Sequence, residues 1–441
     1  MSVEISPQRR LDIIDALRRG TVPRAGLDTF AVGVERWQTA LDEELQRVRS
    51  GAGVFKAVRG EYGSGKTFVA RWIEERARRQ GFATAEVQIS ETETPLHRLE
   101  TVYRRLIERL ATTDVTDGGF RSVIERWFYV LEEDALAAGD VSEHDTAALL
   151  ARTSKLLEER LAEITRHAPM FATALRGYRE AAARGDAARA ESLLAWLGGQ
   201  PNVAAAAKRE AGIKGDLDHF GALGFLQGLL AVLRDAGFSG LVVVLDEVET
   251  LQRMRGDVRE RALNALRQLI DEVDSGRFPG LYLLITGTPA FFDGAQGVQR
   301  LPPLAQRLHV DFTTDARFDN PRAVQIRLAA FNQERLEEVG RRIRDVYASH
   351  TPSRERLLSV ADDAYVRDLA RGVAGRLGGK VGIAPRIFLK KLVADVLDRV
   401  DQFPDFDPRR DYALTVVETE MTAVERAASG AASVDDIALE L

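Results

Sequence analysis

The 441-residue chain contains no cysteine. This absence excludes disulfide bonds, thiolate metal sites and cysteine nucleophiles, and it is consistent with the reducing environment of the cytoplasm. The chain also has no apolar run that approaches the length of a membrane span, and its N-terminus lacks the apolar core typical of a signal peptide. We therefore expect a cytoplasmic protein with no membrane segment.

Histidine is scarce, and neither sign of charge dominates. The six histidines are scattered along the chain, and no two stand at the spacing typical of a shared metal ion, which argues against a structural metal site. The formal net charge of −6 argues against a globally basic nucleic-acid-binding protein, although it leaves a local basic patch open. A chain of this length exceeds one ordinary hydrophobic core, so we expect two or three domains.

One glycine-rich segment, residues 60–67, fits the phosphate-binding P-loop pattern G-x-x-x-x-G-K-[ST]. The apolar run at 54–58 precedes it like a strand, and apolar residues at helical spacing follow it. Because a strand, a loop and a helix in this order are the context that the motif requires, we expect a nucleoside triphosphate with Mg²⁺. The expected phosphate-binding residues are Gly60, Glu61, Tyr62, Gly63, Ser64, Gly65, Lys66 and Thr67.

The residue types of this segment suit phosphate chemistry. Glycines let backbone N–H groups approach the phosphates without an intervening Cβ atom, and the following helix adds partial positive charge at its N-terminus. Lys66 is placed to bridge the β- and γ-phosphates, and the Thr67 hydroxyl is placed to ligate Mg²⁺. The alternative is a glycine-rich turn before an ordinary helix, which the matched context disfavours.

The pattern of apolar residues predicts an α/β fold with helical additions. Residues 1–50 have the pattern of two helices around a turn, and residues 51–319 alternate strands and helices as in a doubly wound parallel sheet. Within that region, residues 113–215 are rich in alanine and arginine and have a helical pattern throughout, which we interpret as an insertion. Residues 320–401 are again helical in pattern, and residues 402–441 form a polar tail.

A pair of carboxylates follows the continuous apolar run at 241–245. Apolar residues that end in Asp246-Glu247 are typical of the Walker B element, the partner of a P-loop. Ligands bind outside the carboxyl ends of parallel strands, so we expect Asp246 to hold Mg²⁺ and Glu247 to orient and deprotonate the attacking water. The alternative is a helix N-terminus at which acidic residues complement the helix dipole.

Further polar residues follow the next apolar run, 281–285. A polar side chain at a neighbouring strand end can contact the γ-phosphate or the water, for which Thr288 is the first choice and Thr286 the second; the alternative is a turn closed by glycine and proline. Arg300 and Arg307 flank the next prolines, and one of them could neutralise charge on a neighbouring subunit's γ-phosphate. In an arginine-rich chain, however, a single arginine is usually a solvated surface residue.

The order of these motifs resembles that of an AAA+ ATPase. Gly382-Ile383-Ala384-Pro385-Arg386 is similar to the element that opens the helical lid of that superfamily, and the resemblance implies that Arg386 is its sensor 2 arginine. It further implies an AAA+-like P-loop NTPase with a five-stranded parallel sheet of order 5-1-4-3-2, a C-terminal helical lid, Arg307 as an arginine finger, and ATP-dependent homo-oligomerisation. The segment around Val32-Gly33 stands where such proteins begin to enclose the adenine.

Within the superfamily, the chain resembles the ATP-binding proteins of bacterial phage-exclusion (BREX) systems, of the BrxD type. The likeness includes residues 18–23, 60–67, 245–249 and 286–289, and it runs over nearly the whole length. It implies hydrolysis of ATP with Mg²⁺, and service to a multi-protein or protein–DNA complex of antiphage defence. Other defence proteins are the implied partners.

Three alternatives stay open at this point. The first is a nucleotide-gated scaffold that docks partners through the aromatic residues of 113–215, although these aromatics can equally fill that segment's own core. The second is direct DNA binding through residues 351–400, which hold ten Lys and Arg against six Asp and Glu, with Arg386, Lys390 and Lys391 close together; a solvated lid face is the plainer interpretation. The third is a small-molecule kinase.

Overall fold

The computed structural model describes residues 5–139, 144–378, 385–421 and 425–426. The chain divides into two compact units that do not follow chain order. The first unit comprises Met1–Ala40, Val58–Glu75 and Asp311–Leu441, and the second comprises Leu41–Ala57 and Arg76–Val310. Each is described below by itself.

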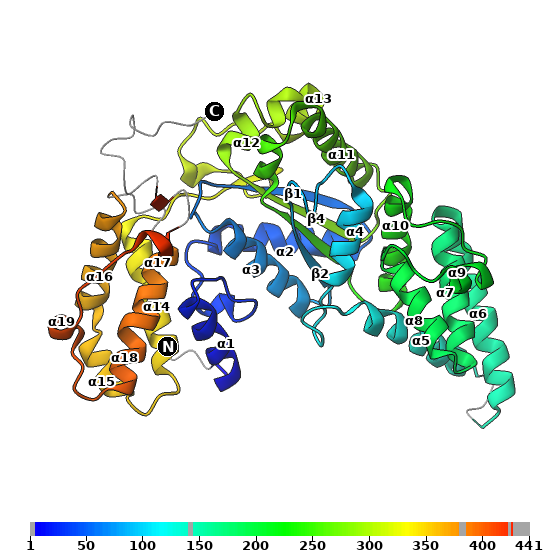
Figure 1. The fold of residues 1–441 in the computed structure, drawn as a ribbon, viewed down its shortest axis with the longest axis horizontal. Helices are drawn as coiled ribbons and strands as arrows, with labels where there is room; N and C mark the ends of the chain where they lie inside the picture. The colour runs from blue at the N-terminus through cyan, green and yellow to red at the C-terminus, as the bar shows by residue number, and fades with distance from the viewer. Residues whose placement is uncertain (1–4, 140–143, 379–384, 422–424, 427–441) are drawn as a thin grey trace. The chain divides into compact units, whose positions relative to one another are not determined.

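The elements alternate between strand and helix in the middle of the chain and are helical toward both ends (Figure 1). The strands are β1 (Val54–Arg59), β2 (Ala83–Gln88), β3 (Leu241–Asp246), β4 (Leu281–Gly287) and β5 (Gln325–Arg327). The helices before β3 are α1 (Pro7–Arg18), α2 (Glu35–Arg49), α3 (Lys66–Arg79), α4 (Leu99–Glu108), α5 (Phe120–Ala137), α6 (Thr146–His167), α7 (Pro169–Ala183), α8 (Ala187–Leu197), α9 (Ala205–Glu210) and α10 (His219–Asp235). The α-helices after β3 are α11 (Gly256–Asp274), α12 (Pro289–Asp293), α13 (Pro302–Leu308), α14 (Gln333–Ala348), α15 (Arg354–Val360), α16 (Asp363–Arg376), α17 (Pro385–Lys390), α18 (Asp398–Gln402) and α19 (Pro408–Asp411). Shorter 3₁₀ segments are η1 (Leu27–Thr29), η2 (Val248–Arg253), η3 (Val298–Arg300), η4 (Ala316–Phe318) and η7 (Glu418–Glu420), and η6 (Lys391–Leu397) is π-helical.

The five strands form one parallel sheet in the order β2-β3-β4-β1-β5. This is the predicted order 5-1-4-3-2 counted from the opposite edge, so that prediction is confirmed. Every residue of β1, β3 and β4 is buried, as expected for parallel strands that are covered on both faces. The register aligns Ala83 of β2 with Leu241 of β3, and Leu241 with Leu281 of β4.

The fifth strand differs from the sequence analysis, which expects helix from residue 320 onward. β5 spans only Gln325–Arg327, and its pattern of two buried residues and one half-buried residue carries no periodicity that a sequence could show. Its place is fixed by pairing, since the N–H of Leu328 donates to the carbonyl oxygen of Arg59 at 2.8 Å. A strand this short is therefore visible only once its partner is known.

In the second unit, α5 to α9 occupy the segment that the sequence predicts to be helical, and the described residues of 113–215 contain no strand. Consecutive helices of this group pack together, and α10 contacts α5, α6 and α7 (Figure 1). The segment's aromatics mostly fill its own core. Phe120, Trp127, Phe128 and Trp196 are buried, whereas Tyr129 is 60% exposed. Trp127 also donates to the Asp235 carboxylate of α10 at 2.6 Å.

In the first unit, the helices after β5 pack around α14, which contacts α15, α16, α17 and η6. α1 joins them through contacts with α14, α17 and η6. The Arg18 guanidinium donates to both oxygens of Asp398, at 2.6 and 2.8 Å, which fixes the C-terminal end of α1 against α18. The N-terminal helix is thus part of the C-terminal bundle. Among the described residues, no helix combines the length and apolar character needed to cross a membrane.

A buried ion pair lies beneath the central strands of the second unit. Lys56 of β1 is 1% exposed, and its Nζ atom lies 2.5 Å from Oε1 of Glu44 on α2. The Tyr282 hydroxyl of β4 donates to the other carboxylate oxygen at 2.7 Å. Burial lowers the pKa of Lys56, although Glu44 acts in the opposite direction, and burial raises the pKa of Tyr282 well above its ordinary value. These three buried side chains satisfy one another's hydrogen-bonding groups.

We expect Lys56→Met to destabilise the protein strongly, because it leaves the Glu44 carboxylate buried without its cation. Breaking one partner of a buried pair typically costs about 3–5 kcal/mol of unfolding free energy. Equilibrium unfolding in urea measures this loss of unfolding free energy. Arg176→Met, which removes the more exposed pair of Arg176 with Glu158, is the matched control and should cost less than about 1 kcal/mol. Equal costs for the two variants would contradict a structural role for the buried pair.

Candidate functional site

The glycine-rich segment connects β1 to α3 as the motif predicts. β1 ends at Arg59 and α3 begins at Lys66, so residues 60–65 form the loop between them. Gly63 and Gly65 have φ angles of +78° and +91°, a region that residues with a Cβ atom rarely adopt. The loop conformation therefore depends on glycine at both positions.

The Lys66 side chain folds back over this loop. Its Nζ atom donates to the carbonyl oxygens of Gly60 and Glu61 at 3.0 and 3.4 Å, and it lies 4.9 Å from the centre of the Tyr62 ring. Thr67 follows, half-buried, in the first turn of α3. An ammonium group at a helix N-terminus, above a loop of left-handed glycines, is an arrangement that suits phosphate.

The N-terminal segment of the first unit is tied to α3. The Glu75 carboxylate accepts from the backbone N–H groups of Gly26 and Leu27 at 2.9 and 2.8 Å. The Phe30 ring packs edge-on against Phe68, with ring centres 5.3 Å apart. These contacts hold the chain that leads into Val32-Gly33 beside the helix that follows the loop, and they leave the predicted adenine-enclosing role as a prediction.

A second group of predicted site residues lies in the second unit, where β3 ends. Asp246 is 4% exposed and Thr286 of β4 is fully buried. The Thr286 hydroxyl donates to Oδ1 of Asp246, and the backbone N–H of Glu247 lies 3.1 Å from both that oxygen and Oγ1 of Thr286. The Asp246 carboxylate is therefore fixed in one orientation.

Glu247 adopts a strained backbone conformation. Its φ angle is +59°, and among the described residues only Asn202 shares a positive φ without being glycine. Residues other than Gly, Asn and Asp have a higher conformational energy in this left-handed region. Backbone strain of this kind is found most often at functional sites. The Glu247 carboxylate accepts from Nε2 of Gln88, the last residue of β2, at 2.9 Å.

The sequence analysis did not identify Gln88. The signal that could have found it is the register of the sheet, which places Gln88 beside Asp246. The structure also separates the two threonines that the sequence proposes at the end of β4. Thr286, the second choice, contacts Asp246 directly, whereas Thr288, the first choice, is buried at the N-cap of α12.

Arg307 forms an ion pair within its own unit. It lies on α13, where its guanidinium pairs with the Asp271 carboxylate of α11 and donates to the carbonyl oxygen of Pro303 at 2.8 Å. About a third of the side chain is exposed. Arg300, the other candidate, is exposed. An inter-subunit role for Arg307 requires exchange of its bond to Asp271.

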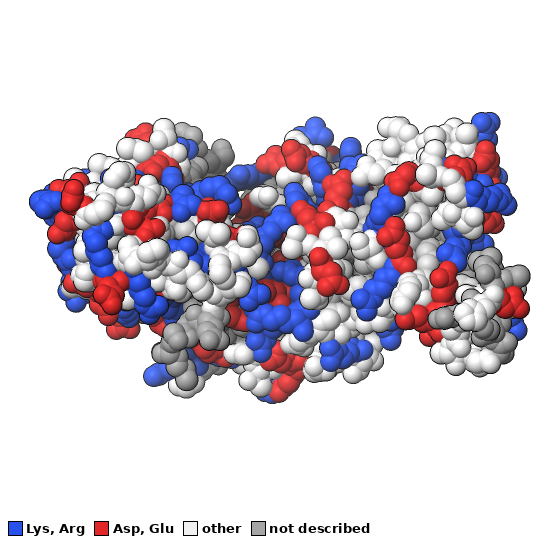
Figure 2. All heavy atoms as spheres, turned by 90° about the horizontal axis from the view of Figure 1, so that it is seen from below, with Lys and Arg blue, Asp and Glu red and all other residues white. Residues whose placement is uncertain are grey.

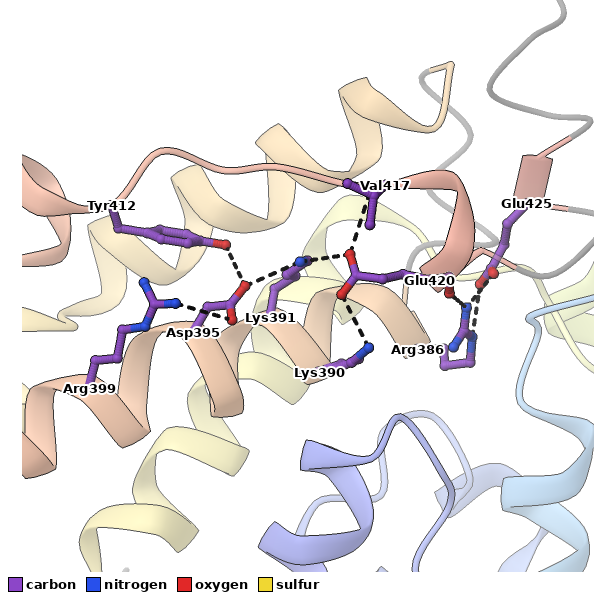
Figure 3. Close-up of polar contacts among 9 residues, drawn as sticks. All are labelled: Arg386, Lys390, Lys391, Asp395, Arg399, Tyr412, Val417, Glu420 and Glu425. Carbon is purple, nitrogen blue, oxygen red and sulfur yellow. Dashed lines mark hydrogen bonds and ion pairs between the residues drawn. The ribbon is translucent and has the colours of Figure 1, made fainter.

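Arg386 is engaged as well, in the first unit (Figure 3). Its guanidinium pairs with both oxygens of the Glu425 carboxylate and donates to the carbonyl oxygen of Glu420. Lys390 and Lys391, the other cations of the predicted basic patch, both pair with the Glu420 carboxylate. Gly382, Ile383 and Ala384, which complete the predicted lid element, lie outside the described residues.

The charges on the patch of Arg386, Lys390 and Lys391 are therefore balanced by carboxylates of the same chain. On the face drawn in Figure 2, basic and acidic side chains are likewise interspersed. A phosphate backbone is bound by accumulated positive charge, so this arrangement gives the direct DNA-binding alternative no support.

The two residues that the sequence predicts to hold Mg²⁺, Thr67 and Asp246, have side-chain oxygens of the kind that suits this ion. This ion is commonly held by one or two carboxylates together with phosphate oxygens of the substrate, rather than by a cage of protein ligands. Asp246 offers a carboxylate held by two hydrogen bonds, and Thr67 offers a hydroxyl next to the Lys66 cation. These residue types fit the ion that the sequence predicts.

Comparison with known proteins identifies a family. A model of the family described as BREX system ATP-binding protein BrxC/D matches residues 5–416. The match covers nearly the whole chain and confirms the resemblance stated from the sequence. No curated protein and no solved structure matches the chain.

Replacing Glu247 by glycine is expected to stabilise the protein, because glycine adopts the left-handed region without steric cost. The expected gain in unfolding free energy is about 1 kcal/mol, measured by thermal unfolding. Asn202→Gly is the matched control and should gain less, because asparagine tolerates the same region. If Glu247→Gly gained no more than Asn202→Gly, the strain at Glu247 would be refuted.

Proposed function

The chain belongs to the family of BREX system ATP-binding proteins BrxC/D, and we propose that it hydrolyses ATP to assemble or remodel a multi-protein defence complex. Membership of the family implies ATP binding and a role in a BREX system. The observation that carries the hydrolysis proposal is the junction at the end of β3. There a buried carboxylate is fixed by hydrogen bonds, and a second carboxylate follows it in a strained conformation.

In this proposal, the loop of residues 60–65 and Lys66 bind the triphosphate. Lys66 exchanges its bonds to the carbonyl oxygens of Gly60 and Glu61 for bonds to the β- and γ-phosphates. The exchange is favourable because the Lys66 ammonium gains the attraction of negatively charged phosphate oxygens, whereas the carbonyl groups that it leaves are neutral. Thr67 and Asp246 would supply oxygen ligands to Mg²⁺, and the bound ion would neutralise charge that develops on the phosphates.

Glu247 acts as the general base that takes a proton from the water attacking the γ-phosphate. Its bond from Gln88 orients the carboxylate before the reaction, and Thr286 orients Asp246 in the same way. Thr288 contacts the γ-phosphate or the water from the end of β4. Orientation of this kind lowers the barrier because the groups need not be ordered during the reaction.

Assembly belongs to the same proposal. Arg307 leaves Asp271 and reaches the γ-phosphate of a neighbouring subunit, while Arg386 contacts the nucleotide from its own lid. The protein therefore forms a homo-oligomer when ATP is bound. Other proteins of the same defence system are the partners of this oligomer, and DNA is reached through them.

We expect Lys66→Ala and Glu247→Gln to separate ATP binding from hydrolysis. Lys66→Ala removes the cation that holds the phosphates and should abolish binding, measured by isothermal titration calorimetry. Glu247→Gln should retain binding but slow phosphate release by about 10²-fold or more, the usual contribution of a general base.

Lys155→Ala, at an exposed lysine of α6, serves as the control and should leave both quantities unchanged. Light scattering on the same samples tests assembly, since Glu247→Gln should be larger with ATP than without it. Turnover that is equal in the native protein, Lys66→Ala and Glu247→Gln would refute the proposed activity.

Thr286→Val is expected to weaken Mg²⁺-dependent ATP binding by about tenfold or more. The change replaces a hydroxyl by a methyl group of the same shape and removes a hydrogen bond to a carboxylate, which is worth about 1.5–3 kcal/mol. A titration of ATP at several Mg²⁺ concentrations measures the loss. Thr288→Val is the matched comparison, and a larger loss there would show that Thr288 rather than Thr286 supports the metal.

A further inference from the structure

A segment near the C-terminus contains carboxylates that form ion pairs with basic residues of α17 and η6. We call it the C-terminal strap and define it as residues 412–421 together with Glu425. Figure 3 shows Arg386, Lys390 and Lys391 pointing from these helices toward the strap, where Glu420 and Glu425 meet them. The strap lies wholly within the first unit.

Glu420 of the strap bridges two cations. Its two carboxylate oxygens accept from Nζ of Lys390 at 3.1 Å and from Nζ of Lys391 at 2.8 Å. Burial acts to raise the pKa of Glu420, but the hydrogen bonds from Lys391 and Lys390 outweigh it and hold the pKa below its ordinary value. The carboxylate is therefore charged at neutral pH.

Glu425 forms an ion pair with Arg386. Nε of Arg386 donates to Oε1 of Glu425 at 3.1 Å, and a terminal nitrogen pairs with Oε2. The Glu425 side chain is 7% exposed and that of Arg386 is 34% exposed. A guanidinium offers the same two-pronged donor set to a carboxylate and to a phosphate. The donors with which Arg386 would contact a nucleotide are thus the ones that it gives to Glu425.

The strap is attached by polar contacts toward its two ends and by few apolar residues, of which Met421 is buried. At one end, the Tyr412 hydroxyl donates to Oδ2 of Asp395 at 3.0 Å, and the Arg399 guanidinium lies 5.7 Å from the centre of the Tyr412 ring. Between the ends, Val417 is 50% exposed. Segments held by few apolar contacts open at low free energy. η6 beneath it is π-helical, a form that recurs at functional sites.

From this arrangement we infer that the C-terminal strap is an autoinhibitory contact, in which Glu425 competes with the nucleotide's phosphates for Arg386. The inference rests on the proposed function, since it takes Arg386 to contact ATP. Glu425 is tethered to the same chain, so it competes at a high effective concentration. Full engagement of ATP then requires the strap to release Arg386, and a partner that binds the released strap would activate the ATPase.

The decisive variant is Glu425→Gln, which keeps the shape of the side chain and removes its charge. We expect it to bind ATP about two- to fivefold more tightly than the native protein and to hydrolyse it faster, a change of the size that a partly exposed ion pair contributes. A fluorescent ATP analogue measures affinity, and phosphate release measures turnover. In an Arg386→Gln background the same change should have no further effect.

Glu418→Gln is the matched control, because Glu418 is an exposed glutamate of the same strap. It should leave affinity and turnover unchanged. Hydrogen exchange on the native protein provides a second measurement that does not depend on any variant folding. ATP with Mg²⁺ should increase exchange across residues 412–421, while Lys66→Ala with ATP should show no increase.

The outcomes separate the two proposals. If native protein binds ATP and Lys66→Ala does not, but Glu425→Gln changes neither affinity nor turnover, the strap is a structural contact and only the inference fails. The same holds if the effect of Glu425→Gln persists without Arg386. If neither native protein nor Glu425→Gln binds ATP, the proposed function fails, and the inference fails with it.

Discussion

Complete burial of β1, β3 and β4 is the constraint on which the rest of the structure depends. Strands without a solvated face satisfy their backbone groups only through neighbouring strands, and they need helices on both sides. Polar side chains are therefore displaced to the strand ends, where Gln88, Asp246 and Thr286 lie. The exception is Lys56, which is tolerated in the sheet because Glu44 and Tyr282 satisfy it.

The two arginines that we propose for nucleotide chemistry have one property in common. Arg307 and Arg386 lie in different units, yet each pairs with a carboxylate of its own unit, Asp271 and Glu425 respectively. The charge of each guanidinium is therefore balanced within its own unit. The cost is that any catalytic use of these side chains begins with the exchange of one anion for another.

Much of this fold follows from the sequence, for identifiable reasons. Continuous runs such as Leu241–Leu245 predict buried strands, and the glycine pattern predicts the loop at 60–65. The strand order came from resemblance rather than from any pattern in the residues. The sequence does not predict β5, because three residues are too few to show a periodic pattern. It does not predict the hydrogen bond between Gln88 and Glu247 either, because only the pairing of strands brings these residues together. The sequence does not predict the C-terminal strap, because a polar segment has no hydrophobic pattern. The positions of its carboxylates depend on cations that are distant in the sequence.

The tryptophans are divided equally between the two units, so their fluorescence can report on each unit. The chain has four, and all are buried: Trp37 and Trp72 belong to the first unit, while Trp127 and Trp196 belong to the helical segment of the second. Indole emission depends on the polarity around the ring, so each pair reports on its own half of the molecule. Replacing one pair by phenylalanine would leave an intrinsic optical probe of the other. Motions of the two halves could then be followed separately, without attaching a dye.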